Sequence, residues 1–296
     1  MNRSDEIFET RPVRRRRKLK WAVLGLIASI ALVCLGCWLW TFRSPVQTTE
    51  IFRGVTYTCE QLPETSESGG LLHVVEVDLT APGVDLYVTP MHPGALEKGW
   101  QYEMSWPWWQ GRAKGLAVAV NANLFQAKDG GFALPGSYAR SAETAVSAGV
   151  TNHIDPNSYL VWFERNLTPH VERTKPPSQA ALDRAYWGVS GQGVLLDNGK
   201  INSSASAVTD RLTLLGVDTR RARLWLVAVD KASQRFAGQL MSDLGAEYAI
   251  QLDSGDSTCM FLGSAAEGVR SGTVIGGWRP VATTFGVRAL PVEPAR

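Results

Sequence analysis

The chain has few of the residue types from which common catalytic centres are built. Among its 296 residues are 4 cysteines and 4 histidines. The histidines show no spacing typical of a metal site, so each is expected to be structural or exposed; they are His73, His92, His153 and His170. Neither a Gly-x-Ser-x-Gly nucleophile elbow nor a phosphate-binding P-loop is present, which argues against an α/β-hydrolase and a P-loop nucleotidase.

The body of the chain also lacks an excess of positive charge. Residues 1–20 carry eight Lys and Arg against three Asp and Glu, whereas the remaining 276 residues carry 22 against 25. The formal net charge of +2 therefore comes from the N-terminal tail. Because proteins that bind nucleic acid usually present a clustered basic face, no nucleic-acid partner is expected.

One long stretch, residues 21–42, lacks charged residues altogether. As a helix it would span about 30 Å, which matches the hydrocarbon core of a bilayer. Basic residues precede it at 14–18, and tryptophans lie near both of its ends. This pattern predicts a transmembrane signal anchor, with residues 1–20 as a basic cytoplasmic tail and the body exported. The short tail and plain anchor favour a bacterial inner membrane, with the body facing the periplasm.

Two other readings of this stretch are weaker. A cleaved signal peptide usually has a shorter apolar run followed by a small-x-small cleavage site, and none follows here. Residues 35–37 (LGC) are similar to a lipoprotein cleavage site, but Cys34 stands where an aliphatic residue is expected. A single-pass membrane protein is therefore the prediction.

The cysteines divide between the apolar stretch and the body. Cys34 and Cys37 lie within residues 21–42, where they need only be small and apolar, whereas Cys59 and Cys259 lie in the body. A disulfide between the latter two is compatible with an oxidising compartment. The sequence does not give the distance between them, so the pairing stays open.

Short apolar or alternating segments, bounded by turn-forming residues, predict strands throughout the body. They are residues 71–79, 84–89, 116–120, 159–163, a hairpin at 193–201, 212–217, 223–229, 249–252 and 281–288. A helix is predicted over 237–244, closed by Gly245. Many strands with few helices predict an α+β fold: a single domain of mixed, largely antiparallel sheet, behind one N-terminal transmembrane helix. The domain is expected over residues 70–290, with 43–69 as a linker leading into it.

The most informative segment is residues 251–258, with the sequence QLDSGDST. A short apolar strand ends in it, and two carboxylates, Asp253 and Asp256, follow three residues apart. Loops held by a rigid sheet often carry catalytic groups. The same residue types also make ordinary turns, so the loop alone supports both interpretations.

Four segments, in this order, resemble the phosphodiester glycosidase family: residues 119–125 (AVNANLF), 190–196 (SGQGVLL), 209–217 (TDRLTLLGV) and 252–258 (LDSGDST). They are similar to the family's strand ending in Asn-Gly/Ala-x-Phe/Tyr, its Ser/Gly-x-Pro-x-Leu hairpin, its Arg-Thr-x-x-Gly-Val segment and its Leu-Asp-Gly-Gly-Gly-Ser-Ser loop. Residues 279–282 (RPVA), with Gly286 and Val287, match the closing Arg-Pro-Val segment. The resemblance covers residues 70–290.

The resemblance implies hydrolysis of a sugar-1-phosphodiester, which releases a free sugar and a phosphomonoester. Breaking the anomeric C–O bond passes through an oxocarbenium-like state that a carboxylate can stabilise. Asp253 is the candidate for stabilising the anomeric centre or activating water, and Asp256 is the candidate for a partner acid or a metal ligand. An acidic loop near a phosphate could hold a divalent cation, although the sequence fixes no ligand set.

Four further residues are candidates for binding the two halves of such a substrate. Arg211 and Arg279 are candidates for the phosphate, because a guanidinium presents paired donors to phosphate oxygens. Asn121 and Asn123 lie two apart at a strand end, so they face the same way if the strand stays extended. Their neutral amides suit sugar hydroxyls, although Asn also serves in turns.

Hydroxyl and aromatic side chains complete the candidates. Ser257 and Thr258 could contact the substrate through their hydroxyls or bond within their own turn. Four tryptophans could stack on sugar faces, or belong to the core or to a surface near the membrane; they are Trp106, Trp108, Trp109 and Trp278.

The chain departs from the family pattern in its loop and in its hairpin. Ser254 and Asp256 stand where the family has glycines, and Gln192-Gly193 replaces Gly-Pro. Three hypotheses follow, of which a purely structural tethered domain is the weakest. The first is a membrane-anchored hydrolase of glycosyl-1-phosphodiesters acting on exported cell-envelope or capsular glycans. The second is a non-catalytic glycan-binding or exopolysaccharide-export accessory protein that uses the same cleft without chemistry. The sequence does not indicate an oligomeric state.

Overall fold

The computed structural model describes residues 25–26, 29–30, 47–94, 100–136, 138–142, 159–173, 177–263, 269 and 271–292. The chain forms two compact units, Met1–Pro45 and Val46–Arg296. In the first, the four described residues are helical. Within the described residues, no helix is long and apolar enough to cross a membrane. Apart from those four residues, the span predicted at 21–42 lies outside the described part and stays a prediction.

The second unit is built on an eight-stranded sheet with the strand order β1-β2-β3-β16-β15-β17-β13-β14. Its strands are β1 (Gln47–Phe52), β2 (Val55–Leu62), β3 (Ser68–Asp78), β16 (Arg223–Ser233), β15 (Thr209–Asp218), β17 (Tyr248–Gln251), β13 (Gly193–Asp197) and β14 (Lys200–Ile201). Long antiparallel pairs dominate it. Strands β15 and β16, for example, pair from Thr209, which lies opposite Ser233, to Asp218, which lies opposite Arg223. A bulge between Asp210 and Leu212 interrupts that pairing at one end.

Three smaller sheets complete the described strands. The five-stranded sheet is β19 (Gly272–Gly276), β18 (Cys259–Leu262), β6 (Val118–Asn121), β20 (Thr284–Arg288) and β4 (Asp85–Val88). The four-stranded sheet is β11 (Pro169–Arg173), β10 (Tyr159–Phe163), β12 (Trp187–Ser190) and β9 (Ala139–Arg140). The three-stranded sheet is β5 (Tyr102–Glu103), β8 (Phe132–Pro135) and β7 (Phe125–Lys128). All pairings between these described strands are antiparallel.

Helices are few and short in the described part of the domain. They are α2 (Pro107–Ala113), α3 (Gln179–Arg184) and α4 (Gln234–Asp243), with 3-10 turns η2 (Asp129–Gly131) and η4 (Gly255–Ser257). The predicted helix at 237–244 is α4, which begins three residues earlier. It does so because Ser233 caps it: the Ser233 hydroxyl accepts a 3.0 Å hydrogen bond from the Phe236 N–H.

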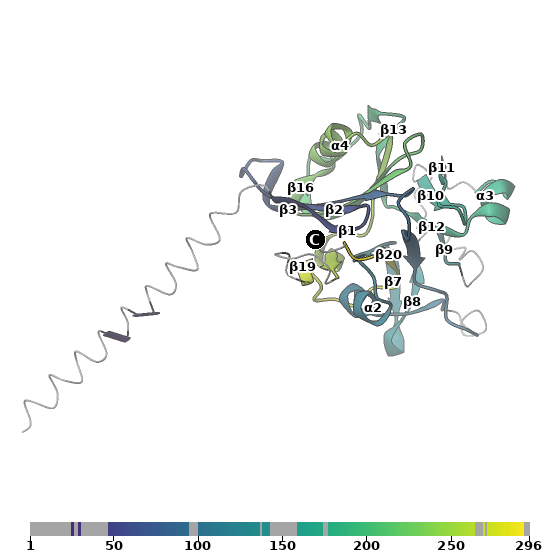
Figure 1. Ribbon diagram of the computed structural model, residues 1–296, viewed down its shortest axis with the longest axis horizontal. Coiled ribbons are helices and arrows are strands. Elements are labelled where there is room, and N and C mark those ends of the chain that lie inside the picture. Colours follow the sequence, from purple (N-terminus) through teal and green to yellow (C-terminus); the bar gives the residue numbers. More distant parts are fainter. Residues whose placement is uncertain are drawn as a thin grey trace, which may run out of the picture. The chain divides into compact units, whose positions relative to one another are not determined.

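The main core lies between the eight-stranded and five-stranded sheets. Alternate residues of β15 and β16, including Leu215 and Leu226, pack there against alternate residues of β6 and β20, including Val120 and Phe285. The four-stranded sheet joins the same core through Val161 and its neighbours. Figure 1 shows α4 and α2 on opposite sides of the packed sheets. Burial of both inner faces therefore holds the two sheets at a fixed separation.

The outer face of the eight-stranded sheet is covered by α4. Leu214 and Trp225 of the sheet pack with Ala237 and Met241 of the helix. The helix approaches closely at Gly216, where an added Cβ would lie 2.2 Å from the Met241 methyl carbon. A glycine in mid-strand is thus required by helix packing.

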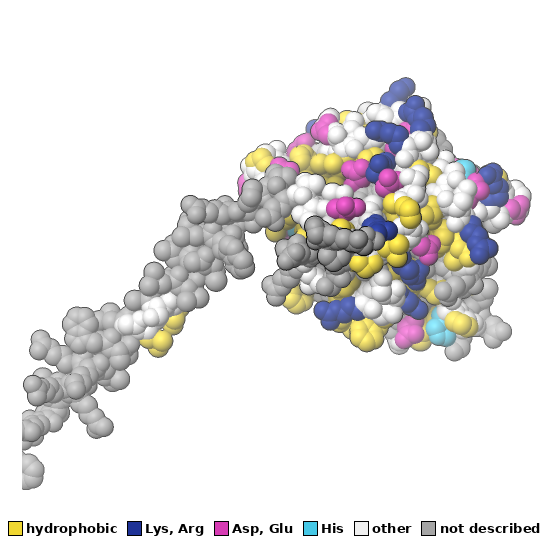
Figure 2. Space-filling model, viewed as in Figure 1, with side chains coloured by type: hydrophobic (Ala, Val, Ile, Leu, Met, Phe, Trp, Pro, Cys, Tyr) yellow, Lys and Arg dark blue, Asp and Glu magenta, His cyan; other side chains and the backbone are white. Residues whose placement is uncertain are grey.

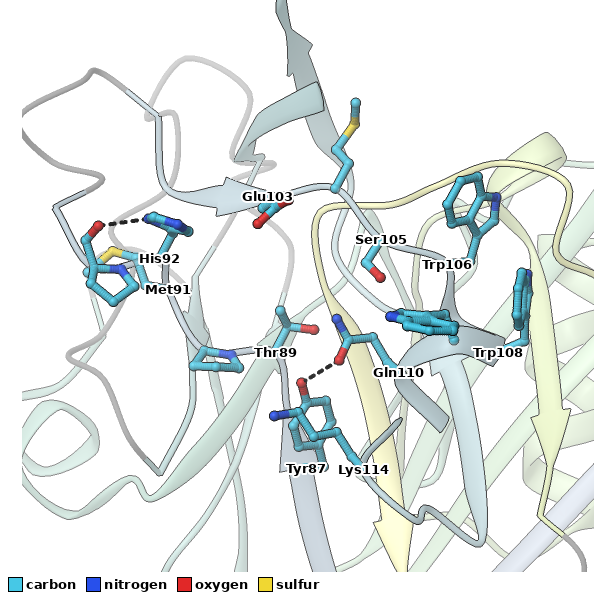
Figure 3. A pocket seen from close by; sticks show the side chains of 14 residues that line it. Tyr87, Thr89, Met91, His92, Glu103, Ser105, Trp106, Trp108, Gln110 and Lys114 are labelled. Atoms are coloured by element: carbon cyan, nitrogen blue, oxygen red, sulfur yellow. Dashed lines mark hydrogen bonds between the residues drawn. The ribbon is translucent and has the colours of Figure 1, made fainter. Parts of the chain in front are cut away.

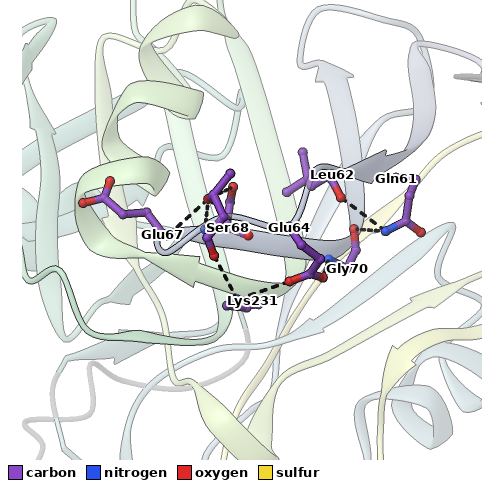
Figure 4. A network of polar contacts seen from close by, with 8 residues as sticks. Gln61, Leu62, Glu64, Glu67, Ser68, Gly70 and Lys231 are labelled. Carbon is purple, nitrogen blue, oxygen red and sulfur yellow. Dashed lines mark hydrogen bonds and ion pairs between the residues drawn. The ribbon is translucent and has the colours of Figure 1, made fainter.

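Polar contacts tie the β2–β3 loop to the neighbouring strand β16 (Figure 4). Within the loop, Thr65 Oγ1 accepts the Ser68 N–H at 2.9 Å. From β16, Lys231 Nζ donates to the Thr65 carbonyl at 3.0 Å and to Glu64 at 3.2 Å. The loop is therefore held in place by side chains as well as by the strands it joins.

The predicted α+β class is confirmed: one domain of antiparallel sheets with few helices. The predicted strands recur within four residues at each end, and 159–163 is reproduced as β10. The structure differs at residues 43–69, expected as a linker, because β1, β2 and the start of β3 lie there. The edge strand β1 was hidden because exposed Thr and Glu side chains precede its buried end at Ile51 and Phe52.

Candidate functional site

The acidic loop 252–258 is the segment in which the chain crosses from one sheet to the other. It leaves β17 of the eight-stranded sheet and enters β18 of the five-stranded sheet. Leu252 N–H still donates to the Thr213 carbonyl of β15 at 2.8 Å, whereas Asp253 N–H donates to the Ala122 carbonyl after β6 at 2.8 Å. The loop therefore sits at a junction where both sheets contribute backbone partners.

Asn121, the last residue of β6, holds this junction together. Its side chain is fully buried. Its Nδ2 donates to the Asp253 carbonyl at 2.8 Å. Its Oδ1 accepts two hydrogen bonds, from Thr213 Oγ1 at 2.6 Å and from Cys259 N–H at 2.9 Å. One amide thus connects β6, β15, β18 and the acidic loop, so Asn121 positions the backbone of Asp253.

Asp253 is the buried acid of the junction, with 5% of its surface exposed. Its Oδ1 accepts hydrogen bonds from Gln192 Nε2 and from Ser254 N–H, each at 2.9 Å. Burial raises the pKa of this carboxyl, while hydrogen bonds from Ser257 and Ser254, the charge of Arg279 and the Gln192 amide act in the opposite direction. The result is an oriented carboxyl whose ionised form is less favoured than that of an exposed aspartate.

Arg279 brings a cation to the same carboxyl. The positive charge of Arg279 lowers the pKa of the Asp253 carboxyl. The side chain is exposed, and its guanidinium carbon lies 5.1 Å from the centre of the Phe125 ring. Stacking on an aromatic face restrains an exposed arginine without neutralising it. The junction therefore presents a buried acid next to an accessible cation.

Asn123 is also fully buried, on the other side of Ala122. Its Nδ2 donates to the carbonyls of Tyr138 at 2.9 Å and Ser190 at 3.1 Å. Thr283 binds it twice, accepting the Asn123 N–H at 3.0 Å and donating to its Oδ1 at 3.2 Å. Asn123 thereby links the strand end of β6 to the segments that carry Gln192 and Arg279.

The turn η4 carries the remaining loop residues. Ser257 and Thr258 are buried, and Thr258 Oγ1 donates to the Arg211 carbonyl at 3.0 Å. Asp256 is exposed on the same turn. At Gly276 of β19 an added Cβ would lie 1.7 Å from the Thr258 carbonyl oxygen. That glycine is therefore needed for β19 to close over the turn.

Arg211 lies in the β15 bulge behind η4. Its Nε lies 3.8 Å from Asp230 Oδ1 and has no hydrogen-bond partner among the described residues, while about a third of its side chain (36%) is exposed. The neighbouring Asp210 carboxylate lies beside the turn, since a Cβ added at Gly255 would be 3.4 Å from Asp210 Oδ2. The bulge thus adds one cation and one further acid to the junction.

The structure also places the cysteines and possible metal ligands. Cys59 and Cys259 are both free, so the disulfide left open by the sequence is not formed. Within the described residues, no group of three or more His, Cys, Asp or Glu side chains is placed to hold a metal ion.

Most of the candidate residues meet at this one junction. Contacts or electrostatic reach connect Asn121, Asp253, Ser257, Thr258, Arg211 and Arg279, and Asn123 joins through Thr283 and Ser190. Asp256 lies on η4, but its side chain makes no hydrogen bond or ion pair with the described residues. Sequence reasoning did not assign Gln192, Thr213 or Asp210, although all three lie in segments that carry the family resemblance.

The segments that form the junction are also the ones that match a known protein family. A family model for phosphodiester glycosidases matches residues 114–288, more than half of the chain. That stretch runs from just before β6 to the end of β20 and includes all the junction residues described above. Among curated protein sequences, none matches this chain.

Two solved structures share the fold at low sequence identity. One is a hypothetical protein from Synechocystis, with 16% identity, a TM-score of 0.54, and coverage of 83% of this chain and 64% of that chain. The other is the catalytic domain of zebrafish N-acetylglucosamine-1-phosphodiester alpha-N-acetylglucosaminidase, auto-inhibited by its pro-peptide, with 17% identity, a TM-score of 0.54 and coverage of 85% of both chains. This chain thus spans less than two thirds of the Synechocystis protein. At these identities the likeness shows the fold alone.

Proposed function

We propose, from the premise that this chain belongs to the phosphodiester glycosidase family, that it hydrolyses glycosyl-1-phosphodiesters of exported glycans while anchored in a membrane. Hydrolysis of glycosyl phosphodiesters is the activity of the family. The observation that carries the proposal for this chain is the buried Asp253 carboxyl, oriented by two hydrogen bonds at the sheet junction, together with the exposed guanidinium of Arg279. A glycosyl phosphodiester needs both, because its sugar carbon becomes cationic and its phosphate is anionic.

Asp253 serves the sugar half of the substrate. In the reaction, water adds to the anomeric carbon, and the bond from that carbon to the phosphate oxygen breaks with its electron pair leaving on the oxygen. The ionised Asp253 carboxylate stabilises the cationic character of the anomeric carbon in the transition state. Because Gln192 and Ser254 bind the same oxygen, Oδ1, the carboxylate is oriented before substrate arrives.

The cations serve the phosphate half. The leaving phosphomonoester is already a stable anion, so cationic contacts can replace much of the protonation that a poorer leaving group requires. Arg279 is accessible and restrained on Phe125. The Arg211 Nε–H is buried and has no hydrogen-bond partner among the described residues, whereas about a third of the side chain (36%) is exposed. We assign both guanidinium groups to phosphate oxygens.

A second carboxylate accepts the proton released by the attacking water. Asp256 and Asp210 both border η4 and are exposed. An exposed carboxylate is within reach of a water molecule at the junction, which is the first requirement of a general base. Comparing Asp256→Asn with Asp210→Asn identifies the base, since only its loss lowers turnover strongly.

The membrane anchor and the exported substrate are supported by the sequence. Residues 21–42 have the length and flanking charges of a signal anchor. On this basis the domain acts on cell-envelope or capsular glycans at the outer face of the inner membrane. Accessibility of engineered cysteines at Val208, which is 79% exposed, and at the N-terminus to a membrane-impermeant thiol reagent tests the orientation, with only the former expected to react in intact spheroplasts.

The bond that breaks separates this reaction from that of an ordinary phosphodiesterase. In water enriched in oxygen-18, cleavage at the anomeric carbon places the label in the sugar, whereas cleavage at phosphorus places it in the phosphate. The proposal requires the label in the sugar. A binding protein without chemistry, the second hypothesis, would release neither product; Ser254 and Asp256 at the family's glycine positions are the features that favour it.

A further inference from the structure

A cleft on the opposite side of the five-stranded sheet from the main core is not used by the proposed chemistry. It has a volume of about 590 Å³ and lies between α2, the residues that follow β4 and the segment around β5. We name it the tryptophan cleft and define it by Trp106, Trp108, Trp109, Gln110, Glu103 and Ser105. Figure 3 shows indole rings on one side, His92 and Met91 on the other, and polar side chains between them.

The indole rings are exposed although they are rigidly held. Trp106 is 41% exposed and Trp109 is 55% exposed. Trp108 packs against the sheet with Leu116 and Phe261, and the other two rings lie against it at centroid distances of 6.1 and 6.2 Å. Exposing a large aromatic ring to water is unfavourable, and a ring that already packs against its neighbours loses little conformational entropy on binding. Such rings are typical of a recognition surface.

Hydrogen-bond donors and hydrogen-bond acceptors both surround these rings. Tyr87 donates to Gln110 Oε1 at 3.0 Å, which fixes the Gln110 amide with its Nε2 left to donate. The cleft is also lined by the Glu103 carboxylate, the Lys114 ammonium and the Ser105 hydroxyl. Aromatic faces surrounded by convergent donors and acceptors match a pyranose ring, whose faces are apolar and whose rim is hydroxylated.

A lipid surface fits the cleft less well. Membrane-binding patches are apolar with a basic surround, whereas this hollow has Glu103 at its mouth. Over the region of α2, Figure 2 shows hydrophobic side chains interspersed with basic and acidic ones. The mixed charge and the concave shape both favour a neutral polar ligand over an anionic bilayer.

One chain segment, residues 279–284, separates the cleft from the catalytic junction. Ser105 of the cleft exchanges two backbone hydrogen bonds with Val281, at 3.0 and 2.9 Å. Arg279, two residues before Val281, serves the junction, and Thr283, two residues after it, binds Asn123. At the next residue, Thr284 N–H donates to Thr89 Oγ1 on the cleft side at 2.9 Å. The two sites thus share one segment.

We propose that the tryptophan cleft binds a saccharide unit of an extended glycan, so that the substrate is an oligosaccharide or polysaccharide. The identification of this unit as part of the substrate rests on the proposed function, but the binding itself does not require turnover. Because the segment 279–284 borders both sites, a glycan with one unit in the cleft has to cross this segment to place another unit at Asp253. Trp106 and Trp109 stack on the sugar face, and Gln110, Glu103 and Ser105 bind its hydroxyls.

Binding is tested with the full-length chain in a detergent without a sugar headgroup. The probes are chitotetraose and maltohexaose, one with acetamido groups and one without, followed by calorimetry and by tryptophan fluorescence. We expect at least one probe to bind, and the double substitution W106A/W109A to weaken its binding about tenfold or more. The control is Val208→Ala, which truncates an apolar side chain that is 79% exposed outside the cleft and leaves binding unchanged.

Three results would overturn the proposal. The first is no binding of either probe by the folded wild-type chain. The second is equal weakening by Val208→Ala and by the double substitution. The third is quenching of the cleft indoles by brominated phosphatidylglycerol in mixed micelles, strengthened by Glu103→Gln, which would show a lipid site. Because these measurements need no turnover, they give an answer even if the proposed hydrolysis is not found.

Discussion

The sheet junction around Asp253 and the tryptophan cleft lie on either side of one segment, yet they are built in opposite ways. At the junction the polar side chains of Asn121, Asn123 and Asp253 are buried and bound to backbone groups of several strands. At the cleft the indoles of Trp106 and Trp109 are exposed, and α2 orients them with few partners. Substitutions at the junction should therefore affect folding or chemistry, whereas those at the cleft should affect binding alone.

The largest effect is expected from Asp253→Asn, which should lower turnover by about a thousandfold or more. The variant should fold, because its amide oxygen can still accept the Ser254 N–H. Folding raises the pKa of Asp253. The protonated carboxyl therefore stabilises the folded state at low pH, and this stabilisation is lost as the pH rises through the folded-state pKa. The variant should thus be at least as stable as the wild type at pH 7, by denaturant unfolding. Lower stability at pH 7 would contradict the buried-acid interpretation.

Asn121→Ala should be the most destabilising change at the junction. It removes three hydrogen bonds and leaves the Cys259 N–H, the Thr213 hydroxyl and the Asp253 carbonyl without this partner. We expect the free energy of unfolding to fall by about 3 kcal/mol. The control Thr213→Val removes one of these bonds and should cost about 1 kcal/mol. Equal losses in the two variants would contradict the positioning role of Asn121.

Arg279→Gln should reduce kcat/KM by about tenfold to a hundredfold through lost phosphate contact. It should also move the acid limb of the pH profile to higher pH, because the Arg279 charge lowers the Asp253 pKa and its removal raises it. In the wild type that limb should already lie above about pH 4, the ordinary aspartate value. The control Arg235→Gln, which removes a cation paired with Glu67, should leave the limb in place.

Gln192→Met should produce a smaller shift in the same direction. It removes one hydrogen bond to Asp253 Oδ1 but leaves the Ser254 N–H on that oxygen. We expect a loss of a few fold in kcat/KM, with a small upward shift of the acid limb. A larger effect than that of Arg279→Gln would show that orientation of the carboxyl matters more than its charge environment.

Trp109→Ala should have the smallest effect on the folded domain, with the free energy of unfolding changed by less than about 0.5 kcal/mol. The ring is 55% exposed, and alanine favours the helix. Turnover of a substrate with a single sugar should be unchanged, whereas that of a polymer should show a raised KM. Thermal unfolding and kinetics on the two substrates measure this contrast.

Local sequence signals were sufficient where a strand is continuously apolar or a hairpin has a strong turn sequence. β10 is reproduced because all five of its residues are apolar and buried, and the 193–201 hairpin because Asn198-Gly199 forms its turn. Strand β1 was missed because an edge strand exposes its polar side chains. Helix α2 was missed because it has only seven residues, although Pro107 stands at its first turn.

The candidate site, like the fold, was predicted only where a local stretch of sequence carries a recognisable signal. Residues such as Asp253 and Arg279 carry charge, so their chemistry is visible in the sequence. Gln192 and Thr213 became significant only when strand pairing placed them against Asp253 and Asn121, at sequence separations of 61 and 92 residues. The two asparagines were predicted to bind sugar, whereas their contacts show that both secure the backbone; direct binding of substrate by them stays a prediction.

The most direct test is product formation from a panel of sugar-1-phosphodiesters, with the full-length wild-type chain beside Asp253→Asn, each with a divalent cation and with a chelator. The proposed function predicts equal amounts of free sugar and phosphomonoester from the wild type, and almost none from the variant. Addition of chelator would show in the same experiment whether a cation contributes. Absence of product from the folded wild type, or equal rates from both proteins, would contradict catalysis by Asp253.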